Sequence, residues 1–215
     1  MAKKSFRKEI TRKFFHLMEL PVLLAYTWIN HIFSHRIGIL ALTVLLLILL
    51  QIEYIRLEYK PKIPEMFNVF RHKEKNNVTG TIFFIMATIV VFAAFDYAIA
   101  LTALLLTVFG DLFSALVGIK FGRHFLKKGK TFEGFFAGLV VNIGIAFLLF
   151  PSFPPLYLSM ALVASLVELL TGKLDDNLTV PLFAAFTGQI MSYFLQIPLG
   201  SFPGPIVESM LQMFR

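Results

Sequence analysis

The stretch YAIALTALLLTVFGDLFSALVGI, residues 97–119, decides the fold class of this 215-residue chain. It is apolar apart from Asp111 and a few small or hydroxyl-bearing residues, and an α-helix needs about 20 such residues to cross the hydrocarbon of a bilayer. A strand of a membrane barrel would alternate apolar and polar residues, and an open sheet edge cannot be satisfied in lipid. The stretch therefore predicts a transmembrane helix with a carboxylate inside it.

Further apolar runs flank this stretch and predict helices over residues 14–33, 37–57, 79–95, 132–150, 156–171 and 178–197. The chain is 57% hydrophobic and 15% charged with a mean hydropathy of +0.76, whereas a soluble domain carries charge at roughly a quarter of its positions. We therefore predict an all-α, polytopic integral membrane protein with about seven transmembrane helices. Residues 1–215 form a single predicted domain, with a basic N-terminal segment (1–13) and an interfacial tail (198–215).

The charges of the chain lie on one side of the predicted helices. Threading seven helices places every Lys and Arg except Arg36 and Arg215 on that side. Such a bias marks the cytoplasmic face, so we predict a cytoplasmic N-terminus in a cell membrane or endomembrane. The net charge of +7 is thereby explained without a nucleic-acid partner. Every acidic residue except Asp96 and Glu208 lies in or near the same half, which predicts a polar site facing the cytoplasm.

The first candidate cluster is Gly110-Asp111 in the predicted helix over residues 97–119. A carboxylate inside a span costs about 2.5–3.5 kcal/mol, so it normally has a partner or a cavity. Ser114, Gly118 and Gly122 follow at helical spacing and predict the close approach of another helix. The alternative is plain helix packing with one buried polar residue.

The second cluster is the connection KFGRHFLKKGKTFEG, residues 120–134. Its basic residues beside glycine-flanked backbone suit a polyphosphate, and Thr131 suits the N-terminus of the next helix. The candidates for phosphate binding are Lys120, Gly122, Arg123, Lys130, Glu133 and Gly134. The alternative is a basic loop that touches only lipid head groups.

The third cluster joins Glu168 to Asp175-Asp176-Asn177. Carboxylate and amide oxygens are hard ligands that suit Mg²⁺ or Mn²⁺, and the chain has no cysteine to offer a thiolate. The alternative is a solvated turn in which Asn177 caps the next helix.

A fourth cluster lies at the start of the chain, where Arg12, His16 and Glu19 share a helical face and Lys13 lies beside them. The alternative is an interfacial anchor with a structural histidine. Glu53 and Arg56 form a similar pair three residues apart, which we interpret as an orienting ion pair.

In this order the clusters resemble the CTP-dependent polyprenol kinase family, which includes dolichol, phytol and farnesol kinases and CTP-dependent diacylglycerol kinase. That family is similar in turn to the CDP-diacylglycerol synthases. The resemblance covers most of the chain, on Arg12-Lys13-x-x-His16, Gly110-Asp111, Lys120-x-Gly122, Lys130-x-x-Glu133-Gly134, Glu168 and Asp175-Asp176-Asn177-Leu-x-x-Pro181.

The resemblance implies transfer of the γ-phosphoryl group of CTP to the hydroxyl of a membrane lipid at the cytoplasmic face. The acceptor would be an isoprenoid alcohol of the dolichol, polyprenol, geranylgeraniol or phytol type, or diacylglycerol. The catalytic candidates are Asp111, Asp175, Asp176, Glu168 and His16. The metal candidates are Asp111, Asp175 and Asp176, and the further nucleotide candidates are Asn177, Arg12 and Lys13. Two alternatives stay open, a CTP-dependent lipid-phosphate cytidylyltransferase and an ion-coupled transporter, and a homodimer is compatible with either enzyme.

Overall fold

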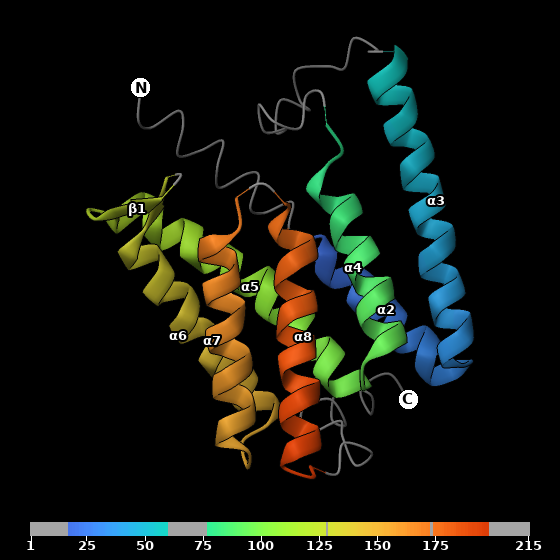
Figure 1. The fold of residues 1–215 in the computed structure, drawn as a ribbon. Coiled ribbons are helices and arrows are strands. Elements are labelled where there is room, and N and C mark those ends of the chain that lie inside the picture. The colour runs from blue at the N-terminus through green and yellow to red at the C-terminus, as the bar shows by residue number, and fades with distance from the viewer. Residues whose placement is uncertain (1–16, 60–76, 128, 173, 198–215) are drawn as a thin grey trace. The chain divides into compact units, whose positions relative to one another are not determined.

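The described part of the chain is helical apart from one small hairpin. The computed structural model describes residues 17–59, 77–127, 129–172 and 174–197, which form seven helices and two short strands (Figure 1). Each predicted helix is present there, with ends that differ from the prediction by a few residues. The predicted N-terminal segment (1–13) and interfacial tail (198–215) lie outside the described residues. The helical fold class is therefore confirmed for the described residues.

Three of the described helices are long and apolar enough to cross a membrane, namely α3 (His35–Tyr59), α5 (Tyr97–Phe121) and α6 (Phe132–Leu149). Two shorter helices, α4 (Gly80–Ala94) and α7 (Pro154–Leu170), are also apolar. Large apolar side chains point outward from these helices, as they do in a protein whose solvent is lipid. These helices are those of a membrane protein by length and composition, whereas seven crossings and the orientation stay predictions.

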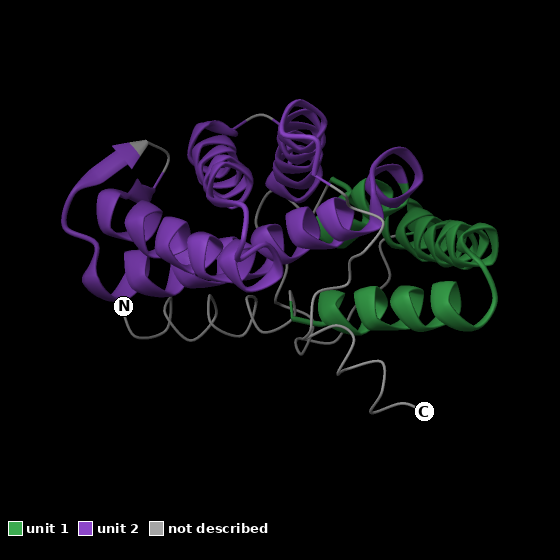
Figure 2. Ribbon diagram, turned by 90° about the horizontal axis from the view of Figure 1, so that it is seen from below, with its two compact units in different colours: residues 1–89 green, residues 90–215 purple. Residues whose placement is uncertain are grey.

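The chain divides into two compact units, residues 1–89 and 90–215 (Figure 2). In the first unit, α2 (Glu19–Ile32) and α3 are joined by a short turn and packed against each other. The Tyr26 hydroxyl lies 2.9 Å from His35 Nδ1 across this turn. A Cβ added at Gly38 would lie 2.8 Å from Cε2 of Tyr26, so the tyrosine ring lies directly on the backbone of α3. The turn is therefore closed by one aromatic side chain of α2.

The ion pair expected between Glu53 and Arg56 is present in the first unit. Arg56 donates from Nε to Glu53 Oε2 at 2.8 Å and from Nη2 to Glu53 Oε1 at 2.7 Å. Glu53 Oε1 also accepts the backbone N–H of Thr79 at 2.8 Å, and Arg56 Nη2 donates to the carbonyl of Asn77 at 2.8 Å. The pair thus joins the end of α3 to the start of α4, which confirms its interpretation as an orienting pair.

In the second unit α5 is the central helix and packs against α6, α7 and α8 (Asp176–Phe194). The first half of α5 is almost entirely buried, from Ile99 to Val108. Between α5 and α6 the chain forms an antiparallel hairpin of β1 (Phe125–Lys127) and β2 (Lys130–Thr131). We expected only a loop over this segment, because two strands this short leave no alternating pattern in the sequence. The hairpin corrects that expectation.

Glycines let α5 and α6 approach at backbone distance. A Cβ added at Gly134 would lie 2.6 Å from the carbonyl oxygen of Ser114, and one at Gly138 would lie 3.2 Å from that of Gly110. The same Cβ at Gly134 would lie 3.2 Å from Cα of Gly118. The close approach predicted for the small residues of α5 is confirmed, and its partner is the glycine stripe of α6. This contact fixes the hairpin and the start of α6 against the last turns of α5.

Candidate functional site

Four helix ends and the hairpin meet at one end of the second unit. The last turns of α5 and α7 arrive there, and α6 and α8 begin there beside β1 and β2 (Figure 1). The sequence clusters of residues 110–111, 120–134, 168 and 175–177 all lie on these segments. The fold therefore brings three separate sequence clusters to one place. Of the fourth cluster, Arg12, Lys13 and His16 lie outside the described residues, whereas Glu19 is buried in the first turn of α2, in the first unit.

Glu168 is held against the turn of α5 that carries Asp111. Its Oε1 accepts a hydrogen bond of 2.7 Å from the Ser114 hydroxyl, and this hydroxyl also lies 3.2 Å from the carbonyl oxygen of Asp111. The Glu168 side chain is only 11% exposed. A Cβ added at Gly138 would lie 3.7 Å from Glu168 Oε2, an ordinary contact distance, so the carboxylate lies beside this residue of α6. The geometry places a largely buried acid of α7 against Ser114, one turn of α5 beyond Asp111.

Lys130 reaches from the hairpin to the carboxylates of two helices. Its Nζ donates to the backbone carbonyl of Glu168, and it lies 4.0 Å from Glu168 Oε1 and 3.9 Å from Asp176 Oδ2. The Lys130 side chain is 28% exposed, so water still reaches the ammonium group. A cation that water reaches and that carboxylates orient can exchange one of its partners for an incoming phosphate. Of the predicted basic phosphate ligands within the described residues, Lys130 is thus the one with ion pairs to the predicted acids.

The turn before α8 is ordered by its own side chains. Asp175 is the N-cap residue, and its Oδ1 accepts the backbone N–H of Asn177 at 3.1 Å. Thr179 Oγ1 lies 3.1 Å from both the carbonyl oxygen of Asp175 and Oγ1 of Thr171, which links α8 to the end of α7. Asn177 is buried, at 3% exposure. The expected capping Asn is therefore wrong, because Asp175 caps the helix and Asn177 is buried. Asp176 faces Lys130 from the first turn of α8.

The start of α6 is capped as predicted, because Thr131 Oγ1 accepts the backbone N–H of Gly134 at 3.1 Å. Glu133 bonds back to the hairpin, with Oε1 at 2.7 Å from His124 Nδ1 and 3.3 Å from the His124 backbone nitrogen. Glu133 was predicted as a site residue, whereas its partner His124 was not. The glutamate closes the hairpin and does not belong to the group around Lys130.

The other predicted phosphate ligands face outward or fill a tight contact. Lys120 and Arg123 are exposed, and Lys120 Nζ lies 5.0 Å from the centre of the Phe121 ring. A Cβ added at Gly122 would lie only 2.2 Å from the carbonyl oxygen of Gly118, so this position requires glycine for packing alone. The described residues therefore divide the predicted phosphate set into Lys130 at the acids and two cations on the outer surface.

Polar residues in mid-helix were missed by sequence analysis. Ser114 was not predicted to donate a hydrogen bond to Glu168, because it was considered only as a small residue at a helix contact. Asn142 of α6 is 1% exposed, and its Nδ2 donates to Ser165 Oγ at 3.0 Å. Its Oδ1 has no hydrogen-bond partner among the residues that the structure describes. A polar side chain inside an apolar span is itself a signal, since it needs a partner in the bundle. A search for such residues would have found Asn142.

The predicted metal ligands Asp111, Asp175 and Asp176 stay predictions. Among the described residues no group of three or more His, Asp or Glu side chains is close enough to hold a metal ion by itself. Mg²⁺ at a nucleotide site usually takes one or two carboxylates together with substrate phosphates, so the donor chemistry present fits an ion that arrives with a nucleotide.

Comparison of the chain with protein-family models, with curated proteins and with solved structures finds no match in any of the three. A function for the chain therefore has to be argued from its motifs and from the geometry of this end of the second unit.

Proposed function

We propose that the protein is a CTP-dependent lipid kinase that transfers the γ-phosphoryl group of CTP to the hydroxyl of a membrane lipid alcohol. The observation that supports this proposal most is Lys130, whose ammonium group lies within 4.0 Å of the carboxylates of both Glu168 and Asp176. Phosphoryl transfer requires mostly positioning and charge neutralisation around the phosphates, with little covalent chemistry from the protein. A lysine beside carboxylates on fixed helices supplies these parts.

The residues would divide the work according to their positions. Lys130 would bind the phosphates of the nucleotide, and Glu168 would hold Lys130 in place through its carbonyl and carboxylate oxygens. Asp111 and Asp176 are the acids available to accept the proton of the lipid hydroxyl. Asp175 and Asn177 would fix the turn that presents Asp176, as their hydrogen bond indicates. Mg²⁺ or Mn²⁺, when bound through these acids, would supply neutralisation of the phosphate charge.

The acceptor is proposed to reach the site sideways through lipid. The second unit carries two helices long and apolar enough to cross a membrane, α5 and α6, and the candidate acids lie near their shared end. A lipid alcohol lying along the lipid-facing surface of these helices would keep its chain in hydrocarbon and its hydroxyl near water. The same arrangement puts the nucleotide on the aqueous side, which we propose to be the cytoplasm of a cell or endomembrane system.

Product analysis tests the proposal directly. The full-length protein would be given Mg²⁺ and CTP labelled either in the γ-phosphate or in the cytidine, with dolichol, geranylgeraniol, phytol, diacylglycerol and phosphatidate as acceptors. Label from the γ-phosphate in the lipid, with CDP released, supports the kinase. Label from cytidine in the lipid, with pyrophosphate released, would show a cytidylyltransferase instead. Movement of neither label into any lipid, by folded protein, would refute both and favour transport.

Variants test the assigned residues. Lys130→Met should lower kcat/KM by about 10²-fold or more, the usual loss when one preorganised charge contact to a transition state is removed. Asp176→Asn should lower it similarly. Asp96→Asn is the matched control. Asp96 lies just before the first residue of α5, at the end of the helix away from the candidate site, and its Oδ2 accepts a hydrogen bond of 2.6 Å from Gln189. Equal activity of the Asp176→Asn and Asp96→Asn enzymes would remove Asp176 from the site.

A further inference from the structure

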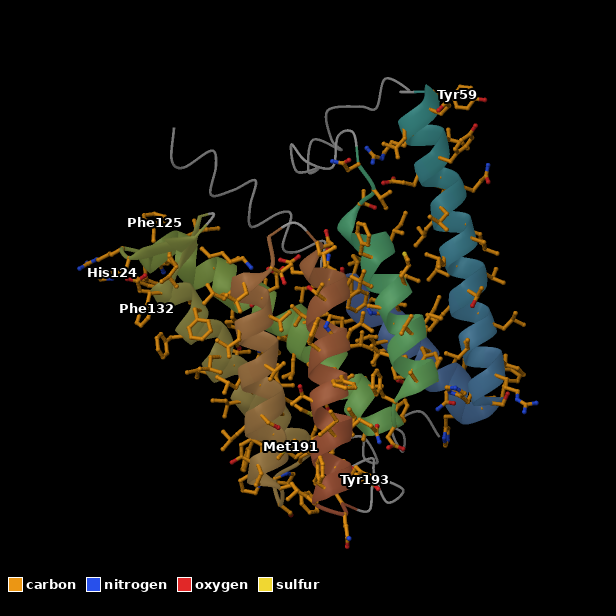
Figure 3. The ribbon with its side chains drawn as sticks, in the orientation of Figure 1. Tyr59, His124, Phe125, Phe132, Met191 and Tyr193 are labelled. Carbon is orange, nitrogen blue, oxygen red and sulfur yellow. The ribbon has the colours of Figure 1, made fainter. Side chains whose placement is uncertain are left out.

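The hairpin between α5 and α6 carries a cluster of exposed apolar side chains. Phe125 is 74% exposed, Phe121 at the end of α5 is 57% exposed, and Leu126 is 47% exposed. Phe125 and Phe132 point away from the ribbon on either side of the hairpin (Figure 3). Single exposed apolar residues are ordinary, but several of them on one short projecting hairpin mark a surface that something covers.

This cluster continues along the outer face of α6. Phe132, Phe136 and Val140 follow at intervals of four residues and are 48%, 45% and 65% exposed. The opposite face of α6 is buried through Gly134, Gly138 and Asn142. Since α6 is long and apolar enough to cross a membrane, its outer face is the face that lipid would cover. The apolar surface of the hairpin is the extension of that face beyond the start of the helix.

The polar groups beside the cluster are basic. Lys120 and Arg123 are exposed, and Lys120 lies over the Phe121 ring. The nearby acid, Glu133, is bound to His124. Aromatic side chains mixed with Lys and Arg are typical of segments that lie at the boundary between hydrocarbon and lipid head groups, and basic residues there attract anionic lipids.

We propose that this hairpin surface, Phe121, Phe125, Leu126 and Phe132 with Lys120 and Arg123, docks on an anionic phospholipid leaflet. Lys120 and Arg123 then bind lipid phosphate, and Lys130 alone of the described hairpin cations turns to Glu168 and Asp176. The competing occupant of Phe125 is the base of the nucleotide, stacked on the ring. A base would cover one or two rings, whereas the exposed surface extends from the hairpin along α6, which favours the leaflet.

Tryptophan fluorescence of the full chain in nanodiscs tests the proposal without any turnover. The result for membrane docking is therefore independent of the result of the kinase assay. Trp28 is the single tryptophan of the chain. In a Trp28→Phe background, Phe125→Trp reports on the hairpin and Val140→Trp reports on the middle of α6. We expect Phe125→Trp to be quenched more by lipids brominated next to the head group, and Val140→Trp more by lipids brominated in mid-chain.

The charge part of the proposal is measured with the same reporter. Brominated phosphatidylglycerol should quench Phe125→Trp at lower mole fraction than brominated phosphatidylcholine does. Adding Arg123→Gln should reduce this preference by up to about fivefold, the effect of one basic residue at an anionic surface. The matched control is Arg36→Gln, an exposed arginine at the start of α3, which should leave the preference unchanged.

Three results would overturn the proposal. The first is a Phe125→Trp reporter quenched by acrylamide but by neither brominated lipid, while Val140→Trp is quenched in mid-chain. The second is quenching of Phe125→Trp by brominated phosphatidylglycerol and by brominated phosphatidylcholine at the same mole fraction, both with and without Arg123→Gln. The third is protection of Phe125→Trp from acrylamide by CTP and not by lipid, which would assign the ring to the nucleotide base.

Discussion

Substituting Gly134→Ala tests whether the contact of α5 with α6 holds the candidate site together. The added Cβ would lie 2.6 Å from the carbonyl oxygen of Ser114, whereas ordinary contact begins near 3.4 Å, so the two backbones must separate by about 0.8 Å. Overpacking of this kind costs about 1–3 kcal/mol. Alanine recovers about 0.5–1 kcal/mol of backbone entropy relative to glycine. The net loss of stability should be up to about 2.5 kcal/mol, with a mid-range value of about 1 kcal/mol.

The matched control for this variant lies in the same helix. A Cβ added at Gly144 meets no atom within 4 Å, so Gly144→Ala should be neutral or slightly stabilising. Circular dichroism of the purified protein in detergent would follow thermal loss of helix. For a chain of this size about 2–4 °C corresponds to 1 kcal/mol, so Gly134→Ala should unfold about 2–4 °C, and at most about 10 °C, below the parent protein. Turnover should fall as well, since Ser114 moves away from Glu168.

The reasoning is refuted if Gly134→Ala and Gly144→Ala unfold at the same temperature. It is refuted in its functional part if Gly134→Ala is destabilised as expected but keeps parental kcat and KM below its unfolding temperature, because the site would then tolerate separation of the two helices.

Three further predictions concern other contacts. Gly110→Ala should cost about 1–3 kcal/mol, because its Cβ would lie 2.7 Å from Oδ1 of Asn142; adding Asn142→Ala should restore at least half of that stability in a double-mutant cycle, and additive losses would contradict the contact. Glu53→Gln should lower the free energy of unfolding by about 3 kcal/mol, since it breaks a largely buried ion pair, whereas Glu58→Gln, at an exposed position of α3, should not change it measurably. Gly129→Ala should accelerate hydrogen exchange in the hairpin, because φ at this residue is +80° and alanine in that region costs about 1–2 kcal/mol; unchanged exchange would show that the hairpin does not depend on this turn.

The helices were predictable because the signal for them is long and simple. Runs of about 20 apolar residues, interrupted by Gly, Pro and charged residues, gave each described helix to within a few residues, as for α5, predicted over 97–119 and found at Tyr97–Phe121. The hairpin was not predictable, because strands of two and three residues leave no periodic pattern and no buried face. Side-chain interactions were predictable where both partners are close in the sequence, as for the ion pair of Glu53 with Arg56 and for the cap that Thr131 forms at the start of α6.

The candidate site was predictable in its composition but not in its pairings. Counting helices placed Asp111, Lys130, Glu168 and Asp176 on one side, because alternate connections of a helical bundle lie at the same end. The partner of Glu168 is Ser114, 54 positions earlier in the chain, and nothing in the spacing of one sequence reports such a contact. It depends on how α5 and α7 are rotated about their axes, which only packing decides.

Because α5 and α7 differ in length, the thickness of the bilayer should affect the position of the candidate site. At 1.5 Å per residue, the 25 residues of α5 extend over about 37 Å, whereas the 17 residues of α7 extend over about 25 Å. The hydrocarbon of a typical bilayer is about 30 Å thick. A helix shorter than the hydrocarbon is matched by local thinning of the bilayer or by tilt, and Glu168 lies two residues before the end of the shorter helix. Lengthening the lipid acyl chains would draw this carboxylate and Lys130 towards hydrocarbon, where water competes less for their contact, so membrane thickness would set how tightly the site holds its lysine.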